Sequence, residues 1–178
     1  AGAIAASAGE HAAVLKAAEA TGLPVWTIPL DGQGRIDLDQ LAQLLTRADA
    51  ENITLLFALH WVNNETGVVQ PMERINALVG PTRHILFVDA VQAFGKLPLD
   101  FAASAPDMMA VSGHKIGTPA GIGALLMKSH ADTVRLIPGG GQEQGRRGGT
   151  ESAALIAAFG AAAGACSYDA KEMTALTH

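Results

Sequence analysis

The sequence predicts an α/β fold of three layers, in which a mostly parallel sheet has helices on both of its faces. Short apolar runs alternate along the chain with segments of helical periodicity, which is the pattern of βαβ units. Three of the runs, residues 53–59, 85–88 and 108–111, contain few or no polar residues, as expected of strands that are buried on both faces.

The first part of the chain alternates helix, strand and helix. Residues 10–20 are rich in strong helix formers, and residues 25–28 are β-branched and aromatic residues between two prolines. Those prolines predict a short strand at an edge of the sheet. Asp37 is placed as the N-cap of a second helix, with Gln40 as its capping-box partner. Leucines at helical spacing then predict an amphipathic helix.

The rest of the chain continues the alternation as one domain, without an internal repeat or linker. Pro71 opens a helix that runs to about Val79, at a position where proline is tolerated. The further expected elements are strands at 53–59, 84–88, 108–112 and 122–127 and a helix at 151–163.

The composition excludes several classes of protein. The 178 residues carry a net charge of -5, which argues against a nucleic-acid surface. No apolar run reaches the roughly 18 residues that cross a bilayer, so we expect no membrane span. The lone Cys166, expected to be a buried structural thiol, favours a reducing, cytoplasmic compartment. We expect no metal site, because no Cys/His cluster has ligand spacing.

Polar residues follow the three apolar runs. An amide, Asn64, comes after the first run, a carboxylate, Asp89, after the second, and an amine, Lys115, after the third. In an open α/β sheet the carboxyl ends of the strands meet at the edge where ligands bind. This set of groups suits a cofactor that carries an aldehyde and a basic ring nitrogen.

Each of these residues also has a structural interpretation. Lys115 could form a Schiff base, since a partly desolvated amine is a better nucleophile, or be a surface lysine in a loop. Asp89 could keep a pyridine nitrogen protonated or cap the loop backbone. Gln92 could donate to a ring hydroxyl or be solvated. Ser112 and His114 offer donors for a phosphate.

Three further features remain open between a functional and a structural interpretation. Residues 63–67 are dense in short polar groups and could equally form a tight turn. His11, near a helix start, could stack on a planar ring or cap the helix. The glycine-rich residues 139–150 contain Arg147 and end in Thr150. They form either an anion site at a helix start or a flexible loop with a threonine cap.

Five strings in register resemble the cysteine desulfurases, which belong to the class V aminotransferase group of pyridoxal-phosphate enzymes. The strings are residues 10–15, 62–70, 88–98, 112–115 and 139–150. The likeness extends from about residue 10 to about residue 160. It implies the large domain of the aspartate aminotransferase-type fold (fold type I), with pyridoxal 5'-phosphate as cofactor.

The resemblance implies a role for each matching residue. Lys115 would hold the cofactor covalently and move the substrate α-proton, and His11 would stack on the ring and relay protons. Asp89 would pair with the ring nitrogen. The other cofactor-binding residues would be Asn64 and Gln92 at the ring hydroxyl, Ser112 and His114 at the phosphate, and Thr150 at the phosphate of the neighbouring subunit of a homodimer.

The implied activity removes sulfur from L-cysteine, leaving alanine and an enzyme persulfide. An acceptor protein would take the sulfur for iron-sulfur cluster or thio-cofactor assembly. A selenocysteine lyase, a transaminase or a truncated core without activity are the alternatives. Residues 1–178 would be one domain, a partial pyridoxal-phosphate-binding large domain. The upstream phosphate loop, the small domain and the persulfide-forming cysteine would lie outside this chain.

Overall fold

A computed structural model describes residues 1–103, 106–132, 135 and 137–166 of the chain. Its centre is a six-stranded sheet with the order β2-β1-β3-β4-β5-β6. Every neighbouring pair is parallel except β5 and β6, which are antiparallel. The strands are β1 Gly2–Ser7, β2 Val25–Ile28, β3 Thr54–His60, β4 Ile85–Asp89, β5 Met108–Ser112 and β6 Gly123–Met127. The predicted mostly parallel sheet is confirmed.

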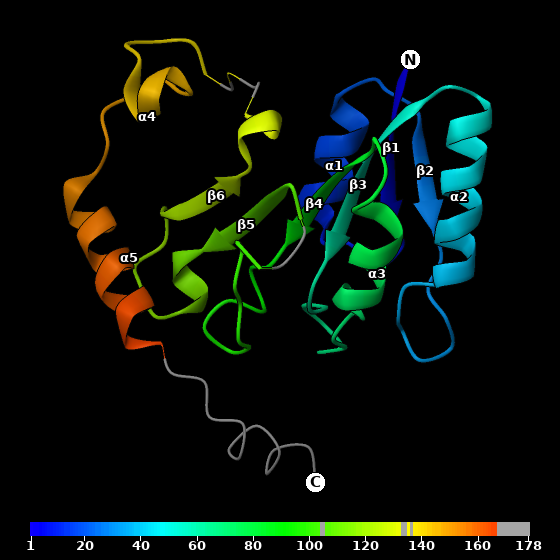
Figure 1. The fold of residues 1–178 in the computed structure, drawn as a ribbon. Helices are drawn as coiled ribbons and strands as arrows, with labels where there is room; N and C mark the ends of the chain where they lie inside the picture. The colour runs from blue at the N-terminus through cyan, green and yellow to red at the C-terminus, as the bar shows by residue number, and fades with distance from the viewer. Residues whose placement is uncertain (104–105, 133–134, 136, 167–178) are drawn as a thin grey trace, which may run out of the picture.

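Helices cover both faces of the sheet, which confirms the three layers (Figure 1). Helix α1, Ala12–Ala20, packs Ala18 against Ile4 and Ala58 on one face. Helices α2, Leu38–Ala50, and α3, Met72–Val79, cover the other face. The larger core lies there, and its central side chains are Leu41, Leu45, Leu55, Phe57, Leu59 and Ile75. The remaining described helices are α4 Gln142–Gly145 and α5 Ala153–Ala165, with the short 3-10 turns η1 Gly113–Lys115 and η2 Ser129–Ala131.

Of the described strands, β1 is the one that the sequence analysis did not predict. Its residues are mostly alanine, and alanine and glycine are depleted in strands, so propensity gave no signal. Tertiary packing overrides that preference, because β1 lies between β2 and β3 and five of its six residues are buried. The small side chains fit the layer between α1 and the core on the opposite face.

The predicted start of α2 and the edge position of β2 are confirmed. Asp37 is the N-cap, and its Oδ1 accepts from the backbone N–H groups of Asp39 and Gln40 at 3.0 Å each. The reciprocal bond from the Gln40 side chain does not occur among the hydrogen bonds of the described residues. The cap alone therefore satisfies two of the free N–H groups of the first turn.

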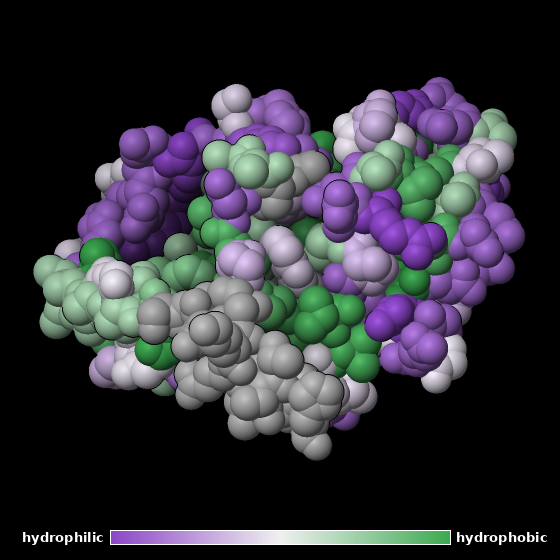
Figure 2. Space-filling model, turned by 60° about the horizontal axis from the view of Figure 1, so that its bottom comes forward, coloured by the Kyte–Doolittle hydropathy of each residue, from purple (hydrophilic) through white to green (hydrophobic). Residues whose placement is uncertain are grey.

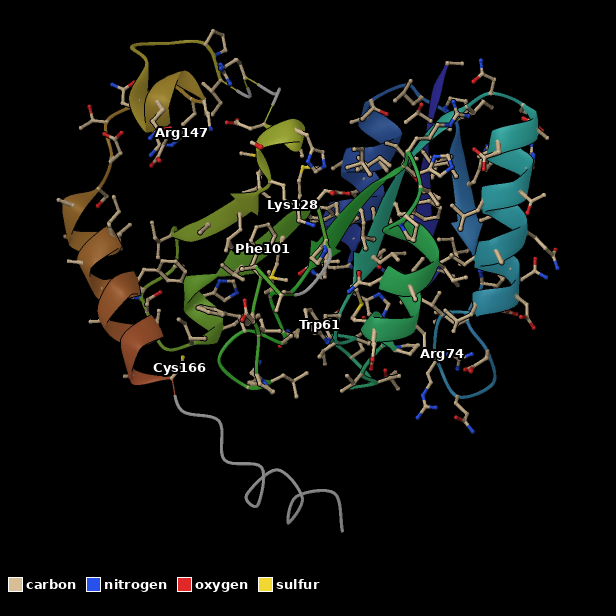
Figure 3. All side chains as sticks on the ribbon, viewed as in Figure 1. Trp61, Arg74, Phe101, Lys128, Arg147 and Cys166 are labelled. Atoms are coloured by element: carbon tan, nitrogen blue, oxygen red, sulfur yellow. The ribbon has the colours of Figure 1, made fainter. Side chains whose placement is uncertain are left out.

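Cys166 corrects the prediction of a buried thiol. It follows α5 as the C-cap residue and is exposed. Helix α5 is apolar on all sides, which suggested burial, yet no residue of the helix is buried. Figure 2 shows its hydrophobic residues on the outside of the molecule, and Figure 3 places Cys166 at the end of the helix. In the described part of the chain, no second layer covers this helix.

The parallel strands all run toward the lower edge of the view in Figure 1, and the residues after them form the loops of that edge. Trp61, the residue after β3, is labelled there in Figure 3. Of the helices described, none has both the length and the apolar character needed to cross a membrane.

Candidate functional site

A cavity of about 340 Å³ lies at the carboxyl ends of β3, β4 and β5. The structure brings seven of the eight predicted site residues to it: His11, Asn64, Asp89, Gln92, Ser112, His114 and Lys115. Ala13, His60, Val62 and Val91 complete the lining. The eighth predicted residue, Thr150, does not line it. We call this cavity the edge pocket.

Strand register explains why these side chains meet. His60 is the partner of Asp89 across β3 and β4, and Asp89 is the partner of Ala110 across β4 and β5. Neighbouring residues in register point to the same face, and so do residues two apart on one strand. Ser112 therefore shares a face with Asp89 and His60. Lys115 follows three residues after Ser112, at the end of the turn η1.

Asp89 both caps the loop and faces the edge pocket. Its Oδ1 accepts from the backbone N–H of Val91 at 2.9 Å. Within the described residues, Oδ2 has no hydrogen-bond partner. The two interpretations of this residue are compatible, because one oxygen holds the loop and the other is available to a ligand.

Gln92 is oriented by a second lysine. The Nζ of Lys96 donates to Oε1 of Gln92 at 2.9 Å. The NH2 group of Gln92 is then the end that remains to donate. Desolvation lowers the pKa of Lys96, and the nearby charge of Lys115 lowers it further. The sequence analysis did not identify Lys96 as part of this arrangement.

His11 is the N-cap of α1, as its structural interpretation expected, and it also lines the edge pocket. Its Nδ1 accepts from the backbone N–H of Ala13 at 3.1 Å. The neutral ring then carries its proton on Nε2. The cap fixes the imidazole at the helix start, with its other nitrogen available as a donor.

Of the two adjacent asparagines, Asn63 forms the tight turn and Asn64 lines the edge pocket. Oδ1 of Asn63 accepts from the backbone N–H groups of Glu65 and Thr66 at 2.9 Å each, which makes the tight turn. Its Nδ2 donates to the carbonyl oxygen of Gly9 at 3.0 Å and ties this turn to the loop before α1. Asn64 is exposed and lines the edge pocket.

Ser112 and His114 form a pair of hydrogen-bonding groups next to Lys115. Oγ of Ser112 lies 2.8 Å from Nδ1 of His114. Gly113 between them is buried, and a Cβ there would collide with Oγ1 of Thr118. A glycine is therefore needed for the close turn that presents both side chains to the edge pocket.

The glycine-rich segment lies away from the edge pocket. Figure 3 places Arg147 at the end of the molecule opposite Trp61. The Nη1 of Arg147 donates to the carbonyl oxygens of Gly148 and Gly149 at 3.1 and 2.7 Å. Thr150 thus does not reach the pocket of its own chain. Its role toward a neighbouring subunit stays a prediction.

Besides Lys96, sequence reasoning missed two buried residues at this site. His60 is 4% exposed and lines the edge pocket, and Glu10 behind it is 7% exposed. Nδ1 and the backbone N–H of His60 both contact Oε1 of Glu10, at 2.7 and 2.6 Å. The position of His60 directly after an apolar run was the available signal. Glu10 gave none, because a polar residue before a helix is ordinarily exposed.

Burial raises the pKa of the Glu10 carboxyl, while the hydrogen bonds and charge of His60 oppose that rise. The charge of Asp89 raises it further. In the described ranges, no group of three or more His, Cys, Asp or Glu side chains is close enough to hold a metal ion.

Comparisons with known proteins agree on one family. The aminotransferase class-V family profile matches residues 2–178. A cysteine desulfurase from Trichormus azollae is 44% identical over 157 residues, which are 86% of this chain and 38% of that protein. The chain thus spans well under half of such a relative's length.

Two solved structures have the same fold. A NifS-like protein from Rickettsia africae aligns with a TM-score of 0.84 at 34% identity, over 91% of this chain and 44% of that one. SspA in complex with cysteine aligns with a TM-score of 0.79 at 36% identity, over 94% of this chain and 49% of that one.

Proposed function

This chain belongs to the aminotransferase class-V family, and we propose that the protein it comes from is a pyridoxal-phosphate-dependent cysteine desulfurase. The observation that carries the proposal is the edge pocket, in which Lys115 and Asp89 come from neighbouring strand ends. The similarity to proteins named cysteine desulfurase supports this activity over others of the family.

The residues of the edge pocket fit pyridoxal phosphate by their chemistry. A primary amine, a carboxylate with one oxygen unpartnered among the described residues, and a serine–histidine donor pair surround one cavity of about 340 Å³. These groups match the aldehyde, the ring nitrogen and the phosphate of the cofactor. Bound there, pyridoxal phosphate would supply an electrophilic carbon and a ring that stores the electrons of a substrate α-carbon.

Lys115 would perform the covalent and proton-transfer steps. Its Nζ would hold the cofactor carbon and later take the α-proton of the substrate. Asp89 would keep the proton on the ring nitrogen through its Oδ2. His11 would lie against the ring, with its Nε2 available to move a proton.

Four residues of the edge pocket would orient the cofactor. Gln92 and Asn64 would meet the ring hydroxyl, with the Gln92 NH2 turned toward it because Lys96 holds the opposite end. Ser112 and His114 would donate to the phosphate. Thr150 would act on the phosphate of a neighbouring subunit, so that two chains complete each site.

The proposed substrate is L-cysteine, and the solved SspA complex with cysteine supports that choice. The products would be alanine and a persulfide on the enzyme. A sulfur-acceptor protein would then receive the sulfur. The region of the whole protein that carries the persulfide would lie outside this chain, whose single cysteine, Cys166, is next to the exposed end of α5.

A cofactor titration tests the proposal. We expect the chain to develop the visible absorbance band of lysine-bound pyridoxal phosphate, and Lys115→Ala to abolish it. Lys16→Ala is the matched control, because Lys16 is an exposed lysine on α1 that does not line the edge pocket. A band that survives Lys115→Ala, or that never forms, would contradict the assignment of the site.

Sulfide release from L-cysteine is the second measurement. We expect none from this chain alone, because it spans only 38% of its relative, and release from the whole protein with dependence on Lys115. A whole protein that binds pyridoxal phosphate but leaves L-cysteine intact would exclude the desulfurase activity and leave the cofactor site standing.

A further inference from the structure

His60 is an unusual ring to find in the edge pocket, because both of its nitrogens are already engaged. Its Nδ1 lies 2.7 Å from Oε1 of Glu10, and its Nε2 lies 2.9 Å from Nε2 of Gln70. The three side chains come from the loop before α1, the end of β3 and the loop before α3. They are all buried: Glu10 is 7% exposed, His60 4% and Gln70 2%.

The Gln70 amide determines which ring nitrogen carries the proton. Its Oε1 accepts from the backbone N–H of Ile36 at 2.8 Å, so its NH2 group points the other way. That NH2 group donates to the carbonyl oxygen of Gly34 at 3.1 Å and to Nε2 of His60. Because an NH2 group can only donate, Nε2 of His60 must accept, and the proton lies on Nδ1.

Glu10 completes the arrangement from the other side. Its Oε1 accepts from both Nδ1–H and the backbone N–H of His60. Its Oε2 is buried without a hydrogen-bond partner among the described residues. Burial raises the pKa of this carboxyl, and a positive charge on His60 would oppose that rise, so Glu10 orients the ring but does not by itself keep it neutral.

A proton on Nε2 of His60 would point at the Gln70 NH2 group. Turning the amide over would instead break its bonds to Ile36 and Gly34. The other titratable groups that line the edge pocket are Asp89 from β4, His11 from α1, and His114 and Lys115 after β5. Of these, Asp89 is the register partner of His60. A charged His60 would put a cation at the strand position paired with Asp89.

We propose that Gln70 and Glu10 are positioning residues: the Gln70 NH2 group keeps Nε2 of His60 unprotonated, and Glu10 holds the proton on Nδ1, so that no cation at the end of β3 competes for Asp89. The Glu10–His60 bonds also fix the loop that ends in His11, the cap of α1. The consequence for Asp89 rests on the proposed function, since it matters only if that carboxylate serves a ligand. The state of His60 itself does not depend on it.

Nuclear magnetic resonance of the full chain with 15N-labelled histidine tests the proposal without cofactor. Long-range 1H–15N spectra distinguish a protonated from an unprotonated ring nitrogen. The His60 signals are identified by their loss in His60→Gln and by contacts to Gly9, which lies beside the His60 Cε1. At neutral pH we expect a proton on Nδ1 and none on Nε2, because the Gln70 NH2 group faces Nε2. A proton on Nε2 at neutral pH would overturn the proposal.

Gln70→Glu is the decisive variant, because it replaces the donor beside Nε2 by an acceptor. We expect Nε2 of His60 to become protonated at neutral pH, and an unprotonated Nε2 in this variant would remove Gln70 from the proposal. Gln43→Glu adds the same charge on the exposed face of α2 and should leave His60 unchanged. If Gln70→Glu does not fold, Glu10→Gln is the second variant to measure. It keeps an acceptor for Nδ1–H, so the same neutral form should persist.

Cofactor affinity supplies the link to function. We expect Gln70→Glu to weaken pyridoxal phosphate binding by about tenfold, the factor that corresponds to one pKa unit of competition for the carboxylate. Unchanged affinity with a protonated His60 would refute the competition for Asp89. Absence of the Lys115-dependent band in the unmodified chain would refute the proposed function instead, and the two failures are therefore distinguishable.

Discussion

The two ends of the sheet each contain a buried histidine, and the two rings are held in different ways. His60 ends β3 at the edge pocket, and His84 directly precedes β4 at the opposite end, each 4% exposed. His60 has partners at 2.7 and 2.9 Å on its two nitrogens. His84 accepts from the backbone N–H of Leu55 at 3.0 Å through Nδ1, but its Nε2 has only Asp49 at 3.6 Å.

The difference shows how the two ends of the sheet disfavour charge. At the end of the sheet opposite the edge pocket, desolvation lowers the pKa of His84, while the charge of Asp49 opposes the shift. At the pocket end, burial raises the pKa of Glu10. At the pocket end, both ring nitrogens of His60 therefore have close partners. At the other end, only Nδ1 of His84 has one, and the nearest partner of its Nε2 is 3.6 Å away.

Removing Glu10 is expected to have the largest effect on stability. Glu10→Leu leaves two donors of His60, the backbone N–H and Nδ1–H, buried without an acceptor. An unsatisfied buried donor costs on the order of 1–3 kcal/mol, so we expect a loss of roughly 3 kcal/mol in the free energy of unfolding. Urea denaturation measures it.

Two companion variants make that test specific. Glu10→Gln retains an acceptor and should lose about 1 kcal/mol or less. Glu19→Leu changes an exposed glutamate on the adjacent helix α1 and should stay within about 0.5 kcal/mol of the unmodified chain. Equal losses for Glu10→Leu and Glu10→Gln would show that the bonds to His60 carry no stability.

Replacing His84 should cost less, because only one donor depends on it. His84→Leu leaves the backbone N–H of Leu55 unpaired and removes an edge contact with the ring of Phe57, at 6.0 Å between centroids. We expect a loss of about 1–2 kcal/mol, again by urea denaturation. His84→Asn places an oxygen near the former Nδ1 and should recover part of it. A loss as large as that of Glu10→Leu would contradict the comparison.

Much of the fold followed from the sequence because its strands are recognisable by local composition. Strands β2 and β5 have their predicted bounds, and β3, β4 and β6 lie within a residue of theirs. Strand β1 was not predictable, because alanine carries no strand preference and only burial between two neighbours makes it a strand. The prediction that Cys166 is buried was wrong for the converse reason: an apolar helix is buried only where another element packs against it.

The edge pocket was predictable to the extent that strand ends determine it. Asp89 and Lys115 could be placed together, since each follows a strand of one parallel sheet. Glu10 and Gln70 could not, because their contacts join segments far apart in the sequence: His60 lies 50 residues from Glu10, and Ile36 lies 34 residues from Gln70. Contacts of that kind depend on side-chain geometry, on which local patterns carry no information.

The smallest expected effect is the pH dependence of stability. Its sign differs between His84 and Glu10, the residues that represent the two ends of the sheet. The folded pKa of His84 lies below its ordinary 6.5, so its contribution is present above that value and is lost as pH falls through the folded pKa. The folded pKa of Glu10 lies above 4.5, so its contribution is complete below that value and is lost as pH rises through the folded pKa. Unfolding free energies between about pH 7 and pH 4 should therefore fall less steeply with acid in His84→Asn than in the unmodified chain. In Glu10→Gln they should fall more steeply, each by less than about 1 kcal/mol over the range. Parallel profiles for the two variants would mean that the two ends of the sheet do not differ in the way their hydrogen bonds indicate.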